Sequence, residues 1–307
     1  VDEFTKKGID FEYARGYDAK SDMPDMQLIT EAVKAAKRAD VAIVFAGLPD
    51  AYESEGYDRT HLELPPSHTM LIESICNANK STVAVIYTGG VVVMPWMKLV
   101  KGALLMYLTG QNNGGAVYDL IFGDYSPCGK LAESFPKALE DNPSYNWFAK
   151  KKIVEYRESI YVGYRYYDTA NKPVAFPFGY GLSYAKFEYS GLSLDKSKMN
   201  QDEILTVKCK IKNTSFIEAK EVVQLYVRAS SNSIFRPLRE LKQFTKVTLK
   251  PLEEKTVTFE LGKRAFAYWN VYISDWHVES GRYFIEISSS SRDTRLSAQI
   301  DIKGDDT

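Results

Sequence analysis

The chain has 307 residues, of which 45% are hydrophobic, 26% charged and 13% aromatic, a composition typical of a globular protein of about two domains. Its 39 lysines and arginines nearly balance its 40 aspartates and glutamates, so we expect neither nucleic acid nor an anionic lipid surface as a partner. Apolar runs such as 83–87 and 91–94 are far shorter than the ~18 residues that a membrane span needs.

Helical and strand patterns alternate over the first part of the chain. An amphipathic helix is expected over 27–39, and it leads into an apolar strand over 40–47. The same cycle predicts helices over 67–79 and 114–122 and strands over 82–87 and 103–107. Strands buried on both faces belong to parallel sheets covered by helices, so we expect an open α/β/α sandwich domain over 1–150.

The first residues form an incomplete pattern. Residues 1–8 resemble the end of an amphipathic helix stopped by Gly8, and 9–14 are expected to form a strand. Because a domain rarely begins in the middle of a helix, we expect the N-terminal part of this domain to lie before Val1.

The sequence period changes to two after residue 185. Apolar and polar residues alternate most clearly over 205–212, and the pattern recurs over 223–227, 257–261 and 283–287. Such strands without intervening helices predict an antiparallel β-sandwich of the immunoglobulin or fibronectin type III style over 186–307. Residues 151–185, which are rich in Tyr, Phe, Pro and Gly, are expected to form a packed connecting segment between the two domains. The predicted fold class is therefore α/β plus all-β.

Cysteines and histidines are too few and too dispersed for a metal or disulfide framework. The three cysteines are Cys76, Cys128 and Cys209, and their spacing fits neither a disulfide set nor a zinc site. We expect them to be buried or half-buried thiols, which favours a reducing, weakly a cytoplasmic, location. The three histidines lack the spacing of a helical metal pair, so no metal and no cofactor are expected.

The loop after the strand 40–47 holds the densest group of reactive side chains. Open α/β sheets bind ligands beyond the carboxyl ends of their strands, and this loop, 48–65, leaves at that edge. Carboxylates beside aromatic rings suit carbohydrate chemistry, because an acid can protonate a glycosidic oxygen while ring faces cover sugar C–H groups. The candidates are Glu53, Glu55, Asp58, Arg59, Tyr52 and Tyr57. An ordinary solvated loop, in which Arg59 pairs with Asp58, explains the same composition.

A second candidate is the glycine-rich segment 108–115 at a predicted helix start. Its backbone N–H groups are able to hold an anion, but it lacks the Lys-Ser or Lys-Thr pair of a phosphate-binding loop. Tight packing of the helix explains these glycines better. A Ser-His-Asp nucleophile set is disfavoured, because the histidines are dispersed and no G-x-S-x-G motif is present.

Five motifs in order along nearly the whole chain resemble those of glycoside hydrolase family 3 β-glucosidases. They are Glu53-Ser-Glu-Gly-Tyr-Asp-Arg59, Met94-Pro-Trp96, and the motifs within 110–136, 162–168 and 176–184. The resemblance implies an α/β sandwich domain followed by a fibronectin type III-like domain, in agreement with the sequence periods.

The resemblance also implies a catalytic arrangement. Family members hydrolyse β-glucosides with retention, and the acid/base glutamate of their Glu-Gly-x-Asp-Arg motif corresponds to Glu55, with Glu53 as second choice. The family's nucleophile is an aspartate in a (β/α)₈ barrel, which this chain lacks. Ser274-Asp275-Trp276 imitates the sequence around that nucleophile, but it lies between predicted β-sandwich strands, so Asp275 is interpreted as a turn residue.

The expected partners are therefore a carbohydrate substrate and the missing barrel domain. The identity of the sugar stays open, because β-xylosidases and arabinofuranosidases share the family. The side of the chain on which the barrel lies and any assembly into homo-oligomers also stay open. A barrel-less module that binds carbohydrate or another protein is the alternative from a different class.

Overall fold

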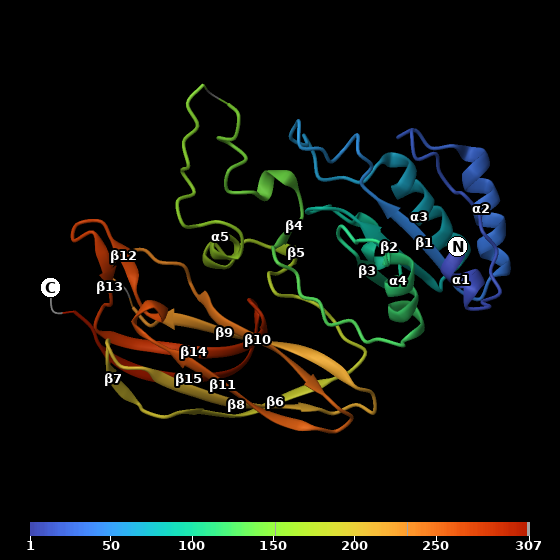
Figure 1. Cartoon of the computed structure of the whole chain (residues 1–307). Helices are drawn as coiled ribbons and strands as arrows, with labels where there is room; N and C mark the ends of the chain where they lie inside the picture. Colours follow the sequence, from blue (N-terminus) through green and yellow to red (C-terminus); the bar gives the residue numbers. More distant parts are fainter. Residues whose placement is uncertain (151, 232, 306–307) are drawn as a thin grey trace. The chain divides into compact units, whose positions relative to one another are not determined.

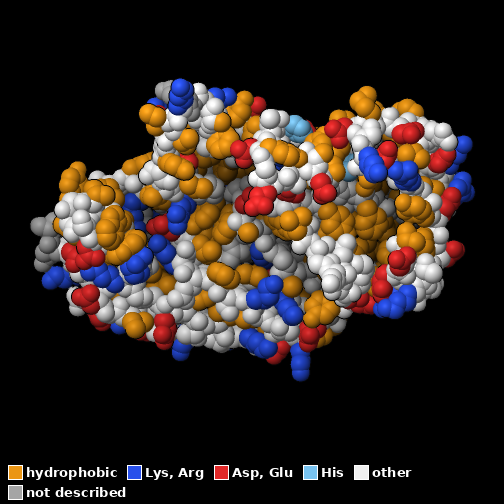
Figure 2. All heavy atoms as spheres, turned by 45° about the horizontal axis from the view of Figure 1, so that its top comes forward, with side chains coloured by type: hydrophobic (Ala, Val, Ile, Leu, Met, Phe, Trp, Pro, Cys, Tyr) orange, Lys and Arg blue, Asp and Glu red, His pale blue; other side chains and the backbone are white. Residues whose placement is uncertain are grey.

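The computed structural model describes residues 1–150, 152–231 and 233–305 and divides the chain into two compact units (Figure 1). The α/β unit comprises Val1–Phe122 and Lys137–Leu139, and the β-sandwich unit comprises Gly123–Pro136 and Glu140–Thr307. On the face shown in Figure 2, basic and acidic side chains are interspersed. No helix in the described ranges is both long and apolar enough to cross a bilayer.

The α/β unit is built around a parallel sheet in the order β1-β2-β3 (Figure 1). Its elements are α1 (Asp2–Lys6), α2 (Met26–Arg38), β1 (Ala42–Gly47), α3 (Pro66–Ala78), β2 (Thr82–Tyr87), the 3₁₀ helix η1 (Pro95–Lys98), β3 (Gly102–Leu105) and α4 (Asn113–Phe122). The predicted helices and strands between residues 27 and 122 are confirmed, with ends displaced by at most two residues.

Local chemistry explains why α2 and α3 begin where they do. The Asp25 carboxylate accepts hydrogen bonds from the backbone N–H groups of Gln27 and Leu28, at 2.9 and 3.1 Å, and so caps α2. Helix α3 begins with Pro66, whose fixed φ suits the first helical position and whose missing N–H is not needed there.

The buried faces of α2 and α3 pack on one face of the sheet. Their apolar side chains form a core with those of β1 and β2: Ile29, Ala32, Ala36, Leu71, Ile72, Ile75, Ala42, Val44, Ala84 and Ile86. The central strand β2 is buried on both faces, as predicted, since Ala84 and Val85 are both inaccessible. The expectation was wrong for β1, because it is an edge strand whose Phe45 remains 41% exposed.

The strand predicted over 9–14 is absent. The Phe11 ring packs edge-to-face on Phe4 of α1, with 5.8 Å between ring centroids. The Glu12 carboxylate forms an ion pair with Arg38 of α2. These contacts hold the segment against helices, so its backbone joins no strand ladder. The predicted end of the first helix is confirmed, since Gly8 follows α1 with a φ of 69° that favours glycine.

The β-sandwich unit consists of two main antiparallel sheets. They are ordered β10-β9-β14-β15-β7, with a parallel β15-β7 edge, and β11-β8-β6 (Figure 1). The strands are β6 (Phe187–Leu194), β7 (Lys198–Asn200), β8 (Leu205–Asn213), β9 (Ala219–Ala229), β10 (Glu240–Leu249), β11 (Glu254–Leu261), β14 (Gly281–Ser290) and β15 (Asp293–Lys303). The hairpin of β12 (Tyr268–Asn270) and β13 (Asp275–His277) follows the 3₁₀ helix η3 (Lys263–Ala265).

Alternation in the sequence becomes alternation of burial in these strands. In β8, Leu205, Val207, Cys209 and Ile211 are fully buried, while Lys208 and Lys210 between them are exposed. These residues face the same core as Val223, Leu225, Ile285 and Ile287 of the other sheet. The predicted β-sandwich is confirmed.

Residues before the β-sandwich strands also pack in this unit. Strand β4 (Phe135–Pro136) pairs with β5 (Val174–Phe176), and the N–H of Leu131 donates to the carbonyl of Tyr180 at 2.8 Å. The Lys130 ammonium lies 3.2 Å from the Glu221 carboxylate of β9. Of the predicted domain 1–150, residues 123–136 and 140–150 thus belong to the compact β-sandwich unit, and Lys137–Leu139 belong to the α/β unit.

An ion pair with a buried carboxylate fixes the segment 152–185 to the turn between β14 and β15 of the same unit. Asp168 lies in the short helix α5 (Tyr164–Thr169), and its carboxylate accepts a hydrogen bond from Nε of Arg292 at 2.6 Å. The same guanidinium donates to the carbonyls of Tyr167 and Lys172 at 3.0 and 2.8 Å. Arg292 thus satisfies three acceptors that the segment presents.

Replacing Arg292 by methionine should destabilise this unit strongly. The substitution leaves the buried Asp168 carboxylate without its cation, a loss on the order of 3 kcal/mol in the free energy of unfolding. The control Arg282→Met breaks an exposed pair with Asp301 and should cost less than about 1 kcal/mol. Urea unfolding of both variants measures the difference, and equal losses would contradict the assigned role of Arg292.

Candidate active site

The site begins where β1 and β2 end side by side. Their parallel register places Gly47 opposite Tyr87, and the N–H of Leu48 donates to the Tyr87 carbonyl at 2.9 Å. A Cβ atom on Gly47 would lie 2.3 Å from that carbonyl oxygen, so only glycine permits this close approach. Two loops consequently leave the sheet at one edge: the β1 end loop, residues 48–64, and the β2 end loop, residues 88–91.

His68 holds the start of the β1 end loop from beneath. Its Nδ1 accepts a hydrogen bond from the N–H of Gly47 at 3.4 Å, and its ring lies 3.9 Å from that of Tyr17. Burial lowers the pKa of His68 below its usual value. The neutral ring is the form that keeps Nδ1 free to accept this hydrogen bond.

The tip of the β1 end loop closes on itself. The Tyr57 hydroxyl donates to the Asp50 carbonyl at 2.8 Å, and Ser54 and Tyr57 form an isolated antiparallel bridge. Glu55 lies within this turn, and its side chain is exposed. The fold therefore presents the Glu55 carboxylate to solvent on a turn that its neighbours shape.

Two side chains join the β1 end loop to the β2 end loop. The Glu53 carboxylate accepts a hydrogen bond from the N–H of Gly89 at 2.7 Å. Nη2 of Arg59 donates to the Val91 carbonyl at 2.9 Å. Arg59 thus bonds the β2 end loop. The solvated-loop interpretation paired Arg59 with Asp58, and the described residues form no such ion pair.

The remaining sequence candidates have different environments. Tyr57 is 50% exposed and Asp58 is exposed, so both are accessible to a ligand. Tyr52 is half-buried, and burial together with a hydrogen bond to Asp22 raises the pKa of its hydroxyl. Its ring packs edge-to-face on His61, with 5.4 Å between centroids. The structure brings all six candidates onto one loop, of which Glu55, Tyr57 and Asp58 are the most open.

The β2 end loop was missed at the sequence level. Thr88 lies at its start with a buried side chain, and its hydroxyl donates to the Gly90 carbonyl at 2.8 Å. The signal was present, because Thr88-Gly89-Gly90 directly follows the predicted strand 82–87 and so had to leave the sheet beside the β1 end loop.

Other candidate sites have structural explanations. In the glycine-rich segment 108–115, a Cβ atom on Gly115 would lie 2.8 Å from Oδ1 of Asn112, so this glycine lets the Asn112 side chain approach the start of α4 closely. Asp275 is the first residue of β13, next to Ser274 with a φ of 50°, so it lies at the hairpin. The described residues contain no cluster of three or more His, Cys, Asp or Glu able to hold a metal ion.

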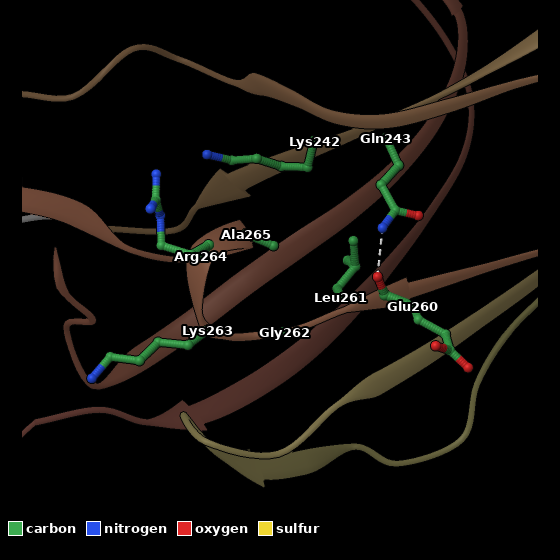
Figure 3. A pocket seen from close by; sticks show the side chains of 8 residues that line it. All are labelled: Lys242, Gln243, Glu260, Leu261, Gly262, Lys263, Arg264 and Ala265. Carbon is green, nitrogen blue, oxygen red and sulfur yellow. Dashed lines mark hydrogen bonds between the residues drawn. The ribbon is translucent and has the colours of Figure 1, made fainter.

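A pocket of about 350 Å³ lies in the β-sandwich unit (Figure 3). It is lined by Lys242, Gln243 and residues 260–265, and none of the sequence-predicted site residues is among them. The Gln243 amide donates to the Glu260 carbonyl at 2.6 Å, and the Lys242 ammonium lies 3.2 Å from the Glu240 carboxylate. The Gln243 amide and the Lys242 ammonium are thus engaged with the protein itself.

Comparisons with known proteins agree with this two-part architecture. The family model of the glycosyl hydrolase family 3 C-terminal domain matches residues 10–184. The family model of the fibronectin type III-like domain matches residues 221–291. Among solved structures, the Bifidobacterium adolescentis GH3 beta-glucosidase has a TM-score of 0.95 and 43% identity, covering 99% of this chain and 45% of that chain. A Kluyveromyces marxianus beta-glucosidase in complex with glucose has a TM-score of 0.87 and 37% identity, covering 92% and 34%.

Sequence relatives differ in the sugar that their names specify. Thermostable beta-glucosidase B of Acetivibrio thermocellus is 50% identical over 303 residues, which cover 97% of this chain and 40% of that protein. The exo-alpha-(1->6)-L-arabinopyranosidase of Bifidobacterium breve is 46% identical over 307 residues, covering 99% and 40%. The chain therefore spans only 40% of the length of these relatives.

The stability of the α/β unit should depend on pH through His68. Because its pKa is lowered in the folded state, the unfolded chain binds more protons, and the free energy of unfolding should fall as the pH drops below the unfolded histidine pKa of ~6.5. The variant His68→Leu should lose this part of the pH dependence, whereas His61→Gln, at a more exposed histidine, should keep it. Denaturant unfolding between pH 5 and 8 measures both slopes; an unchanged slope in His68→Leu would contradict the prediction.

Proposed function

The chain belongs to glycosyl hydrolase family 3, and we propose that it forms the part of a retaining exo-β-glucosidase that supplies the general acid/base. The observation that carries the proposal is the exposed Glu55 carboxylate on a loop at the carboxyl edge of a parallel sheet. The beta-glucosidases among the matched proteins, at up to 50% identity, support the activity.

In the proposed reaction, a barrel aspartate outside this chain bonds to the anomeric carbon of a terminal β-D-glucosyl residue. Glu55 gives its proton to the glycosidic oxygen as the bond between that oxygen and the anomeric carbon breaks. The Glu55 carboxylate then takes a proton from water, whose oxygen replaces the aspartate on the anomeric carbon with net retention. Retention requires the two carboxyl groups to lie ~5–5.5 Å apart, so the barrel must approach the loop tip closely.

The residues around Glu55 are suited to hold a sugar. Tyr57 offers an accessible aromatic ring for sugar C–H groups, and Asp58 offers hydrogen-bond acceptors for hydroxyls. The Tyr52 hydroxyl bonds Asp22, and the Arg59 guanidinium bonds the Val91 carbonyl. We therefore assign these two residues to substrate binding only through the atoms that these hydrogen bonds leave free. An acid of this type acts where water is excluded, and the barrel and the bound sugar would supply that exclusion around Glu55.

An α-L-arabinopyranosidase is the second candidate, favoured by the 46% and 45% identity to two bifidobacterial enzymes of that name. The β-xylosidase and arabinofuranosidase alternatives stay open as well, because the sugar contacts would come mainly from the barrel. Assaying the full-length protein against nitrophenyl glycosides of all four sugars decides among them. If the intact mass shows that the natural protein lacks several hundred further residues, the barrel-less module is favoured instead.

Glu55→Gln in the full-length enzyme should affect substrates according to their leaving groups. The glutamine amide has no acidic proton to give, so kcat/KM for alkyl glucosides, which reports glycosylation, should fall by about 10²–10⁴-fold. For dinitrophenyl glucoside, whose leaving group needs little protonation, kcat/KM should fall far less, while its kcat falls because Glu55 also activates the water that releases the enzyme-bound sugar. Steady-state kinetics on both substrate classes measure this difference.

Asp275→Asn is the matched control, because it makes the same kind of carboxylate-to-amide change at the β12–β13 hairpin. It should leave both activities unchanged. Equal losses of kcat/KM on the two substrate classes in Glu55→Gln would count against Glu55 as the acid, and a collapse of turnover in Asp275→Asn would overturn its assignment as a turn residue.

A further inference from the structure

We propose that Glu53 is a positioning residue: its hydrogen bond to the N–H of Gly89 fixes the loop tip that carries Glu55, and Glu53 itself transfers no proton. The inference rests on the proposed function for its catalytic consequence, while the hydrogen bond is independent of it. Glu53 and Glu55 are both carboxylates of one turn, and the structure gives them opposite environments.

The contact between Glu53 and Gly89 is specific. The N–H of Gly89 lies 2.7 Å from Oε2, a length typical of a charge-assisted hydrogen bond. A Cβ atom at position 89 would lie 2.6 Å from Oε1 of the same carboxylate, which is too close for a side chain. Only a glycine at position 89 leaves room for the Glu53 carboxylate. The φ of Gly89 is outside the left-handed region, and this glycine is therefore needed for space and not for backbone conformation.

The β2 end loop that receives Glu53 is itself well held. The buried Thr88 hydroxyl donates to the Gly90 carbonyl at 2.8 Å and accepts from the Gly90 N–H at 3.3 Å. Arg59, which follows the tip, bonds Val91 of this same loop. The turn that carries Glu55 is thus fixed on both sides to one backbone segment that continues from the central strand β2.

Displacement of this turn matters for proton transfer. A general acid must lie within hydrogen-bond distance of the oxygen that it protonates, and a misplacement of about 1 Å can cost ~10²-fold in rate. Glu55 is exposed and lies in the short turn between Glu53 and Arg59, whose side chains bond the β2 end loop. The position of the Glu55 carboxylate therefore depends on these two contacts. Glu53, in contrast, accepts a hydrogen bond from the backbone N–H of Gly89 through one carboxylate oxygen.

Three substitutions in the full-length enzyme test the proposal. Glu53→Gln keeps an oxygen that accepts from Gly89, Glu53→Leu removes it, and Gly89→Ala places a methyl group where the carboxylate lies. Glu63→Leu is the matched control, since Glu63 is an exposed carboxylate of the same loop without a backbone hydrogen bond in the described structure. The readouts are amide hydrogen exchange of peptides covering 48–60 and 88–91, and kcat and KM for an alkyl glucoside.

The expected result is rescue by the conservative variant. Glu53→Gln should keep slow exchange and kcat within about threefold of the parent, whereas Glu53→Leu and Gly89→Ala should exchange faster and lose about 10²-fold in kcat with little change in KM. A double variant that combines Glu53→Leu with Gly89→Ala should lose no more kcat than either single variant, because both substitutions remove the same interaction. Glu63→Leu should resemble the parent in both readouts.

Two results would overturn the proposal. If Glu53→Gln loses as much kcat as Glu53→Leu, and azide restores turnover of both on an activated aryl glucoside, then Glu53 is the proton donor. If Glu53→Leu leaves exchange at 88–91 unchanged, the contact does not hold the loop. Failure of the proposed function is distinguishable, because a parent protein without glycosidase activity leaves the exchange results to decide the hydrogen bond.

Discussion

The parallel pairing of β1 with β2 is the constraint on which the candidate site depends. Because the two strands end in register, with Gly47 opposite Tyr87, both end loops leave at the same edge of the sheet. A glycine at position 47 lets the strand ends approach closely, and the buried core of α2 and α3 beneath keeps the strands in place. The contacts of Glu53 and Arg59 with residues 88–91 follow from this geometry and shape the turn that presents Glu55.

The two compact units solve different physical problems. The α/β unit has a small sheet whose edge strand β1 exposes Phe45, and it carries the polar loop. The β-sandwich unit has an extensive apolar core between two sheets and uses buried charges, such as Asp168 with Arg292, to fix the irregular segment before its strands. The candidate chemistry thus belongs to the first unit, while the second is organised mainly by packing and buried ion pairs.

Much of the fold could be predicted from local patterns. The period-two alternation of 205–212 became a strand with one buried face, and the apolar run 82–87 became the central parallel strand. The strand expected over 9–14 failed because Phe11 and Glu12 find partners on helices, a tertiary effect that no local pattern contains. The Arg292 contact with Asp168 escaped prediction for the same reason, since the two residues are far apart in the sequence.

The candidate site was only partly readable from the sequence. Composition singled out the loop, whereas the preference for Glu55 over Glu53 came from the family resemblance. The structure adds a physical difference between them, since one carboxylate is exposed and the other bonds Gly89. The most direct test is a crystal structure of the full-length protein with a non-hydrolysable thioglucoside. We expect the Glu55 carboxyl to lie within hydrogen-bond distance of the thioether sulfur, with Glu53 still bonded to the Gly89 N–H. A Glu55 side chain in bulk solvent, remote from that sulfur, would contradict the assignment of Glu55 as the acid.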